Sequence, residues 1–434
     1  MDYEAFLQDF YRLERFGIKL GLDVITELLR RLGDPQARFP AVHVTGTNGK
    51  GSTCAFLAAI LQASGLHVGL YTSPHLVRFN ERIRVDGAPI PDDDVMRLYG
   101  QIRPHMEAMA VENAVHHPTF FEAATAMAFQ HFAERKVDLA VIEVGMGGRY
   151  DATNVFHPEV SVLTCIGLEH TEHLGRTVRR IAREKSGIIK NGRPAVTLDQ
   201  EALPEIEARC RLTGSPLTVV GRDVRVERLR SGLEGQTLRF TNGGDLAVTT
   251  TMLGPHQAEN AALAFASILA LRRRGWEISD EQVKAGFTAA RWPGRLDVVR
   301  RDPLVLVDAA HNAPAAHVLA VALRELDLPK AILVFGVLAD KDVEGMAAEL
   351  VPFASRILTA RPKTERAQGP ERVRSAFTAA AISQGLPPPE IEERPNIAAA
   401  VHDALALAGT KGTVLITGSV YTAGEALEAL GRAP

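Results

Sequence analysis

The chain has 434 residues, 46% of them hydrophobic, and a formal net charge of -3 at pH 7. This length exceeds what one ordinary hydrophobic core organises, so two domains are expected. The charge balance excludes the basic surface typical of nucleic-acid binding, and no apolar run is long enough to cross a bilayer. Three scattered cysteines without metal-type spacing indicate reduced thiols. With no signal-peptide pattern, we expect a cytoplasmic monomer with no nucleic-acid or membrane partner.

Short runs rich in Val, Ile and Leu alternate with helical patterns over the first two thirds of the chain. This alternation is typical of a parallel sheet with helices on both faces. The expected strands are residues 41–45, 67–71, 139–144 and 160–166. Between about residues 217 and 251, polar and apolar residues alternate, with turn signals at residues 231–232 and 242–244. This alternating pattern predicts antiparallel hairpins appended to the first domain, followed by a helix at about residues 257–273.

Pro293 and Gly294 break both helix and strand patterns, so we expect a domain boundary there. The strands expected after it are residues 304–307, 331–335, 357–360 and 413–417. The predicted class is α/β. Residues 1–292 should form a domain with a P-loop-type parallel sheet and a small appended β segment, and residues 293–434 a smaller, Rossmann-like domain.

A glycine-rich turn with a lysine separates the first expected strand from a helix. It reads Thr-Gly-Thr-Asn-Gly-Lys-Gly-Ser-Thr at residues 45–53. Glycines let backbone N–H groups approach an anion closely, and a helix N-terminus adds about half a positive charge. Lys50 could then reach the outer phosphates of a nucleotide. The spacing departs from the strict P-loop pattern, and a plain strand-to-helix turn is the alternative.

Polar groups also follow the other strands of the first domain. Ser73 follows the second strand, Glu143 ends the third, and Glu169 and His170 follow the fourth. Ligands of open parallel sheets bind beyond the carboxyl ends of the strands, so these groups should gather at one edge. For any one of them alone, a capping or turn role is the alternative.

Glu143 ends a nearly continuous apolar run, where an unpaired carboxylate would be costly to bury. A divalent cation is a natural partner, and Mg²⁺ suits a site that also holds phosphates. The hydroxyl oxygen of Ser73 fits such a hard cation. The alternative is a salt bridge from Glu143 to Arg149 or Lys185.

Three further positions carry competing interpretations. Because Mg²⁺ prefers oxygen, Glu169 is a better ligand than His170 on chemical grounds alone. Lys185 stands at a charged helix end, where an exposed lysine is the ordinary interpretation. Asp308 ends a strand of the second domain and should face a cleft, although a helix cap would also explain Asp308 and Asn312.

Together these segments resemble the Mur ligase superfamily, and within it the folylpolyglutamate synthase and dihydrofolate synthase branch. The resemblance covers almost the whole chain. All Mur ligases share the lysine turn, whereas Ser-Pro-His-Leu within residues 71–84 and Gly-Ser-Val-Tyr at residues 418–421 are more specific to the folate branch. The other matching segments are residues 17–23, 143–154, 169–175, 183–188, 256–260, 293–295 and 308–312.

The resemblance implies an ATP-dependent, ADP-forming ligase that joins L-glutamate to dihydropteroate, to folates, or to both through an acyl phosphate. Phosphorylation gives the carboxylate a leaving group, and positive charge from Lys50 and Mg²⁺ stabilises the phosphoryl group in transfer. A bifunctional dihydrofolate synthase/folylpolyglutamate synthase is favoured. A monofunctional folylpolyglutamate synthase and a Mur-type ligase for another acid are the alternatives. The rival classes are a P-loop ATPase or kinase and a nucleotide-dependent switch.

The resemblance also implies roles for individual residues. Those implied for ATP are Gly49, Lys50, Gly51, Ser52, Asn260, Arg295 and Asp308. Those implied for Mg²⁺ are Ser73, Glu143 and His170, which favours His170 over Glu169. Those implied for the pteroate pocket are Thr119, Phe120, Phe121, Arg149 and Asp151, and for the incoming glutamate His311 and Ser419. The catalytic residues expected are Lys50, Lys185 and His311.

Lys185 matches a lysine that is carbamylated in this family, and a carbamylated Lys185 would hold a second Mg²⁺. Glu169 departs from the family, which usually has aspartate there; the added methylene shifts geometry without removing charge. Because the ATP residues come from both domains, catalysis should require closure across the hinge at residues 292–296, which would keep water from the acyl phosphate. The partners implied are small molecules: ATP, L-glutamate and a pterin-containing acid.

Overall fold

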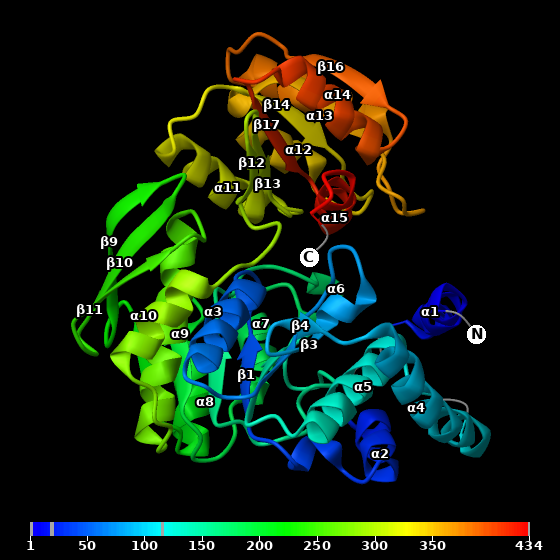
Figure 1. Ribbon diagram of the computed structural model, residues 1–434, viewed down its shortest axis with the longest axis vertical. Helices are drawn as coiled ribbons and strands as arrows, with labels where there is room; N and C mark the ends of the chain where they lie inside the picture. The colour runs from blue at the N-terminus through cyan, green and yellow to red at the C-terminus, as the bar shows by residue number, and fades with distance from the viewer. Residues whose placement is uncertain (1–2, 18–20, 114–116, 433–434) are drawn as a thin grey trace.

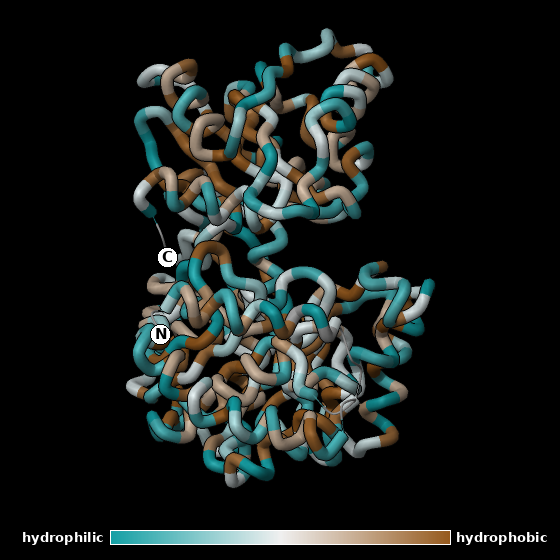
Figure 2. Tube along the Cα trace, turned by 90° about the vertical axis from the view of Figure 1, so that its right-hand side faces the viewer, coloured by the Kyte–Doolittle hydropathy of each residue, from teal (hydrophilic) through white to brown (hydrophobic). Residues whose placement is uncertain are grey.

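The computed structural model describes residues 3–17, 21–113 and 117–432. Two lobes, each built on a mainly parallel sheet, lie one above the other (Figure 1). Figure 2 shows the same two bodies after a quarter turn, with hydrophobic segments concentrated inside each. The predicted α/β class is confirmed. The segment 17–23, which contributes to the family resemblance, includes residues 18–20 and lies partly outside the described residues.

The larger lobe contains an eight-stranded sheet of order β4-β3-β2-β5-β1-β6-β7-β8. The strands from β2 to β8 in that order are parallel, and β3 and β4 continue the sheet in antiparallel fashion. Every residue of β1 and β5 is buried, because helices cover both faces. The strand bounds are β1 Ala41–Thr45, β2 Val68–Tyr71, β3 Ile83–Val85, β4 Ala88–Pro89, β5 Leu139–Glu143, β6 Val160–Leu163, β7 Ala195–Leu198 and β8 Leu217–Val220.

Helices form an apolar layer on each face of this sheet. Helices α3, α9 and α10 share one hydrophobic core with the sheet, and α1, α2, α4 and α5 share another. Every helix in the described part of the chain is too short or too polar to span a lipid bilayer. The bounds are α1 Tyr3–Tyr11, α2 Asp23–Arg31, α3 Lys50–Ala63, α4 Asp92–Glu112, α5 Phe120–Arg135, α6 Thr171–Leu174, α7 Val178–Lys185, α8 Leu203–Thr213, α9 Pro255–Arg273 and α10 Asp280–Ala289.

The alternating segment after residue 217 contains two structures rather than one. Strand β8 joins the main sheet parallel to β7, so the expectation that hairpins begin at residue 217 is wrong. This strand is the sheet edge and only its second half is buried, which made its pattern look like part of a hairpin. The separate antiparallel sheet consists of β9 Arg225–Gly232, β10 Gly235–Thr241 and β11 Leu246–Thr250.

The smaller lobe contains a six-stranded sheet of order β12-β13-β17-β14-β15-β16, in which β12 alone is antiparallel to its neighbour. Strands β12 and β16 are additions to the strands expected from the sequence. The strand bounds are β12 Asp297–Arg301, β13 Leu304–Val307, β14 Ala331–Phe335, β15 Ala354–Ala360, β16 Glu390–Arg394 and β17 Thr413–Thr417. The helices are α11 Ala313–Glu325, α12 Val343–Leu350, α13 Pro370–Ser383, α14 Ile397–Ala408 and α15 Val420–Ala429.

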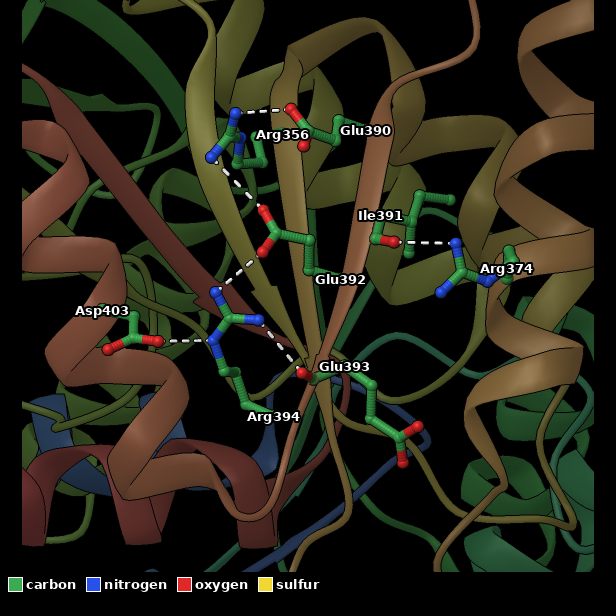
Figure 3. A network of polar contacts seen from close by, with 8 residues as sticks. All are labelled: Arg356, Arg374, Glu390, Ile391, Glu392, Glu393, Arg394 and Asp403. Atoms are coloured by element: carbon green, nitrogen blue, oxygen red, sulfur yellow. Dashed lines mark hydrogen bonds and ion pairs between the residues drawn. The ribbon is translucent and has the colours of Figure 1, made fainter.

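Strand β16 forms an edge of the sheet and carries several charged side chains (Figure 3). Arg356 on β15 pairs with Glu390 and, at 3.2 Å, with Glu392. Arg394 pairs with Glu392 at 2.9 Å and with Asp403 on α14. Charges along an edge strand oppose pairing with another chain. The high charge of β16 also explains why its sequence does not look like a strand.

The antiparallel sheet of the larger lobe reaches the smaller lobe. Arg228 on β9 donates from both terminal nitrogens to Glu325 on α11, at 2.6 and 2.7 Å. Arg301 on β12 pairs with Glu234 at 2.7 Å, and Leu233 packs against the core of the smaller lobe. The hairpin between β9 and β10 is therefore a second attachment between the lobes, separate from the connection at residues 291–296.

A third contact brings helix α15 against the loop after β2. A Cβ built on Gly424 would lie 2.0 Å from the backbone oxygen of Leu76. Since that atom belongs to the backbone, rotation of a side chain cannot relieve the collision. The lobes approach here at a distance that only glycine permits.

Replacing Gly424 by alanine should therefore disturb the lobe contact. We expect a lower melting temperature, with a loss of about 1–3 kcal/mol as for overpacked cores. Gly100→Ala is the matched control, because Gly100 also lies in a helix but no atom lies within 4 Å of its Cβ position. That control should be neutral or stabilising. Equal melting temperatures for the two variants in a thermal scan would contradict the contact.

Candidate active site

The glycine-rich turn between β1 and α3 is packed closely against neighbouring side chains. Gly49 has a φ of 87°, and a Cβ there would lie 2.3 Å from Asn260 Oδ1. A Cβ on Gly46 would lie 1.8 Å from Thr164 Oγ1. Both positions therefore require glycine, Gly49 for its left-handed backbone as well as for the lack of space.

The chain after β6 holds this turn in place. Thr164 Oγ1 donates to the backbone oxygen of Asn48 at 2.7 Å. The backbone oxygen of Cys165 accepts from the N–H of Thr47 at 2.7 Å. Strand β6 consequently ends at Leu163, earlier than expected, because the next residues leave the sheet to bind the turn.

Two lysines converge beneath the turn. Lys50 Nζ donates to the backbone oxygens of Gly46 at 3.1 Å and Thr47 at 3.0 Å. Lys185 Nζ donates to the same Gly46 oxygen at 2.7 Å. Lys185 is only 2% exposed, so its interpretation as an exposed helical lysine is wrong. Burial, and then the charge of Lys50, lower the pKa of Lys185 to about 7, so that a large fraction is neutral near neutral pH.

Glu143 ends β5 beside these lysines and is 4% exposed. One carboxylate oxygen accepts from the backbone N–H of Ser73 at 3.1 Å. Burial raises the pKa of Glu143, while the charge of Lys50 opposes that rise. Among the described residues Glu143 forms no salt bridge with Arg149 or Lys185, so this alternative is wrong. A buried carboxylate without a contacting cation is a group that a metal ion would stabilise.

His170 follows β6 and lines the cavity, and although part of its surface is exposed, protein atoms cover part of the ring. It has a left-handed backbone and precedes the short helix α6. Burial of its ring lowers its pKa, and Glu169 opposes this effect. In the described ranges no three His, Cys, Asp or Glu side chains form a group that could hold a metal. The expected set of Ser73, Glu143 and His170 contains only two such side chains and a hydroxyl.

Asp308 in the smaller lobe connects the hinge with the loop after β13. Its carboxylate accepts from the backbone N–H groups of Leu296 at 2.7 Å and Ala310 at 2.8 Å. Burial raises its pKa, and the charge of Arg295 lowers it. Asp308 is therefore not a helix cap, whereas Asn312 is one: its side chain accepts from the N–H of Ala315 at 2.8 Å and begins α11.

His311 and Ser419 lie near Asp308 but make different contacts. His311 Nδ1 donates to the backbone oxygen of Ala309 at 3.0 Å, and burial lowers the pKa of the imidazole. This leaves Nε2 of a neutral ring free to accept a proton. Ser419 is fully buried and caps α15, accepting from the N–H of Thr422 at 3.0 Å.

A cavity of about 1160 Å³ lies between the lobes and collects most of the expected residues. Its walls come from both lobes, at the carboxyl ends of the strands, as the sheet rule predicts. The expected residues in its lining are Gly49, Lys50, Gly51, Ser52, Ser73, Thr119, Phe121, Glu143, Asp151, His170, Asn260, Arg295, Asp308, His311 and Ser419. The expected residues outside its lining are Phe120, Arg149 and Lys185.

Phe120 and Arg149 are placed away from the cavity by their local packing. Phe120 is 8% exposed and packs on Phe10, with ring centroids 4.7 Å apart. Phe120 is directed into this packing, and its neighbour Phe121 lines the cavity instead. Arg149 is exposed, and its backbone N–H donates to the Glu184 oxygen at 2.8 Å.

Asp151 and Thr119 line the cavity and also stabilise its walls. Asp151 accepts from the N–H of Met146 at 2.8 Å and from Thr153 Oγ1 at 2.5 Å, which closes the loop after β5. Thr119 caps α5 through the N–H of Glu122 at 3.3 Å. These contacts use part, but not all, of the hydrogen-bonding capacity of each side chain.

The sequence indicates no specific role for three residues that line or support the cavity. Gln257 donates to Ser52 Oγ at 3.2 Å and accepts from Asn260 Nδ2 at 3.0 Å, which fixes the start of α3 against α9. Arg82 and His75 line the cavity from the loop after β2. They belong to the folate-specific segment quoted above, but nothing in their spacing indicates that they are buried.

Comparison with known proteins gives a consistent result. The family described as Mur ligase middle domain matches residues 44–268, and that described as Mur ligase, glutamate ligase domain matches residues 294–420. Folylpolyglutamate synthase of Lacticaseibacillus casei is 39% identical over 372 residues, which cover 84% of this chain and 86% of that protein. Dihydrofolate synthase/folylpolyglutamate synthase of Bacillus subtilis is 39% identical over 350 residues, covering 79% and 81% respectively. Folylpolyglutamate synthase of Mycobacterium tuberculosis complexed with ADP has a TM-score of 0.91 and 34% identity, with all of both chains covered.

The tight packing of the glycine turn leads to a prediction. Gly49→Ala should weaken ATP binding by at least about tenfold, or 1.4 kcal/mol, because the new Cβ meets Asn260 and distorts the turn. Isothermal titration calorimetry would measure the affinity. Gly65→Ala is the control, since Gly65 has a similar φ of 82° but no atom within 4 Å of its Cβ position. If both variants bound ATP like the unmodified protein, the turn would not be the nucleotide site.

Proposed function

Because the chain belongs to the Mur ligase family, and within it to the folylpolyglutamate synthase and dihydrofolate synthase branch, we propose that it uses ATP to join L-glutamate to dihydropteroate and to folates. The observation that supports this most is the cavity between the lobes, where the glycine turn lies opposite Arg295 and Asp308. A bifunctional activity is favoured because the Bacillus subtilis relative carries both names. A monofunctional folylpolyglutamate synthase is the second candidate, because the Lacticaseibacillus casei relative carries that name alone.

The proposed reaction has two steps. A carboxylate oxygen of the acid attacks the terminal phosphorus of ATP, the bond to the bridging oxygen breaks, and ADP leaves. The amine of glutamate then attacks the carbonyl carbon of the acyl phosphate, inorganic phosphate leaves, and the nitrogen loses a proton. Holding three substrates together in this way removes about 7–11 kcal/mol of barrier at most.

The residues around the glycine turn would act on the first step. The turn and the start of α3 would hold the phosphates through backbone N–H groups, and Lys50 would place a positive charge beside the terminal phosphate. Ser73, Glu143 and His170 are the residues that would hold Mg²⁺, which when bound supplies further positive charge at the phosphate oxygens. The buried, unpaired carboxylate of Glu143 supports this choice.

The second step needs a neutral amine. His311 is a neutral imidazole with Nε2 free, so it would accept the proton that the glutamate nitrogen loses. Asp308 and Arg295 would hold the nucleotide from the smaller lobe, and Ser419 would contact the incoming glutamate. Closure of the lobes would exclude water, which would otherwise hydrolyse the acyl phosphate.

The activity can be tested by measuring ADP release with dihydropteroate or tetrahydrofolate, each with and without glutamate. We expect release to require both the acid and glutamate. Without glutamate, hydroxylamine should trap the acyl phosphate as a hydroxamate of the acid. A kinase acting on a hydroxyl would give no hydroxamate, and a nucleotide switch would give no acid-dependent release. Either of these results would refute the ligase.

Lys185 would contribute in a modified form. A neutral amine adds to CO₂, forming an N–C bond and releasing a proton, and a lysine with a pKa of about 7 offers that neutral amine near pH 7. The product is an anion, which would stand near Lys50 instead of a second repelling cation. Carbamylated Lys185 would then hold a second Mg²⁺.

Carbamylation of Lys185 predicts a specific signal. Protein equilibrated with ¹³C-bicarbonate should show a carbamate carbon resonance by NMR, and Lys185→Met should abolish it together with most of the ligase activity. Lys284→Met, which removes an exposed lysine on α10, should leave both unchanged. A resonance that persists in the Lys185 variant would show that another amine carries the modification.

A further inference from the structure

Arg82 is a buried cation that the mechanism above does not use. It ends the 3₁₀ turn Phe79–Arg82, lines the cavity and is 9% exposed. A charge buried to this degree is costly unless an opposite charge contacts it. In the part of the chain that the structure describes, no carboxylate forms an ion pair with Arg82. The guanidinium therefore has unused capacity to bind an anion in the cavity.

The groups that touch Arg82 position it without neutralising it. Nε donates to His75 Nδ1 at 2.8 Å. Because Nδ1 accepts this bond it carries no proton, so the imidazole of His75 is neutral. The guanidinium carbon lies 5.2 Å from the ring centroid of Phe120 and 6.0 Å from that of Phe79. Phe120, which was expected to touch the pterin, instead forms an apolar platform under a cation.

Among the described residues, His75 accepts the one side-chain hydrogen bond that the guanidinium of Arg82 donates. Arginine presents five N–H groups in a planar fork, and Nε supplies one of them to His75. The two terminal nitrogens remain, and they match the two oxygens of a carboxylate. An arginine held by rings on one side and by a neutral histidine on another is preorganised for such a ligand.

Arg82 and the phosphate turn belong to different walls of the cavity. Arg82 ends the 3₁₀ turn after β2, whereas Lys50 begins α3 after β1. Both residues line the same cavity. A carboxylate bound to Arg82 would not be the one that receives the phosphoryl group.

We propose that Arg82 binds the unreactive α-carboxylate of the terminal glutamate of a folate, and so selects folates that already carry glutamate. This inference rests on the proposed ligase function. A folate ends in two carboxylates, of which one reacts, whereas dihydropteroate has a single carboxylate, which must react. Arg82 thus acts on one of the two acid substrates and is a specificity-determining residue.

The test compares both acids in the same variant. Arg82→Gln removes the charge and the fork but keeps a polar side chain. The ratio of kcat/KM for tetrahydrofolate to kcat/KM for dihydropteroate should fall about ten- to a hundredfold, as expected when a charge-assisted bond is lost. Arg78→Gln is the matched control, because Arg78 lies on the same segment but is exposed and pairs with Asp92 at 2.8 Å. The control ratio should equal that of the unmodified enzyme.

A second measurement does not depend on the variant folding. The unmodified enzyme should use a tetrahydrofolate whose α-carboxylate is converted to an amide at least tenfold less efficiently than the parent acid. Equal use of the amide and the parent, or an unchanged ratio in Arg82→Gln, would overturn the role of Arg82. Those results leave the ligase in place, whereas an unmodified enzyme that ligates neither acid would refute the proposed function itself.

Discussion

Two ammonium groups share one backbone oxygen, that of Gly46, and the rest of the site depends on this crowding. One lysine comes from the first turn of α3 and the other from the end of α7, so the shared acceptor joins two elements that are distant in sequence. Like charges at such close range in a buried place repel. Burial first, and then this repulsion, lower the pKa of Lys185 and make it easy to deprotonate, while Lys50 remains beside the turn.

The same edge of the sheet also holds the buried carboxylate of Glu143, and nearby positive charges stabilise it. Glu143 would be strongly disfavoured in an apolar environment, but the nearby cations reduce that penalty. Neither lysine contacts it, so the carboxylate stays available within a positive environment. The lysines and Glu143 are charged groups that do not pair with one another. A ligand that carries charges of its own can pair with each of them, and such a site is selective for that ligand.

The position of the site could be predicted from the sequence, because the rule for parallel sheets places the ends of strands together whatever the details of packing. The residues at those ends, such as Ser73 and Asp308, line the cavity as expected. Burial could not be predicted in the same way. Lys185 stands in a charged segment, yet it is covered by the turn of another strand.

Side-chain direction was equally hard to read from residue type. Phe120 and Phe121 are adjacent and chemically identical, and only the start of α5 determines which one faces the cavity. Arg82 depends on Phe120, a residue from a different element, so no local pattern could indicate it. Strand β16 was missed because its charged side chains protect an edge rather than fill a core.

The two attachments of the smaller lobe restrict how it can move. One is the covalent connection at residues 291–296, and the other is the Arg228–Glu325 contact on the hairpin side. Rotation about the line that joins them would separate helix α15 from the loop after β2, which is the third contact between the lobes. The close packing at Gly424 therefore opposes this rotation, so residue 424 influences how readily the lobes separate.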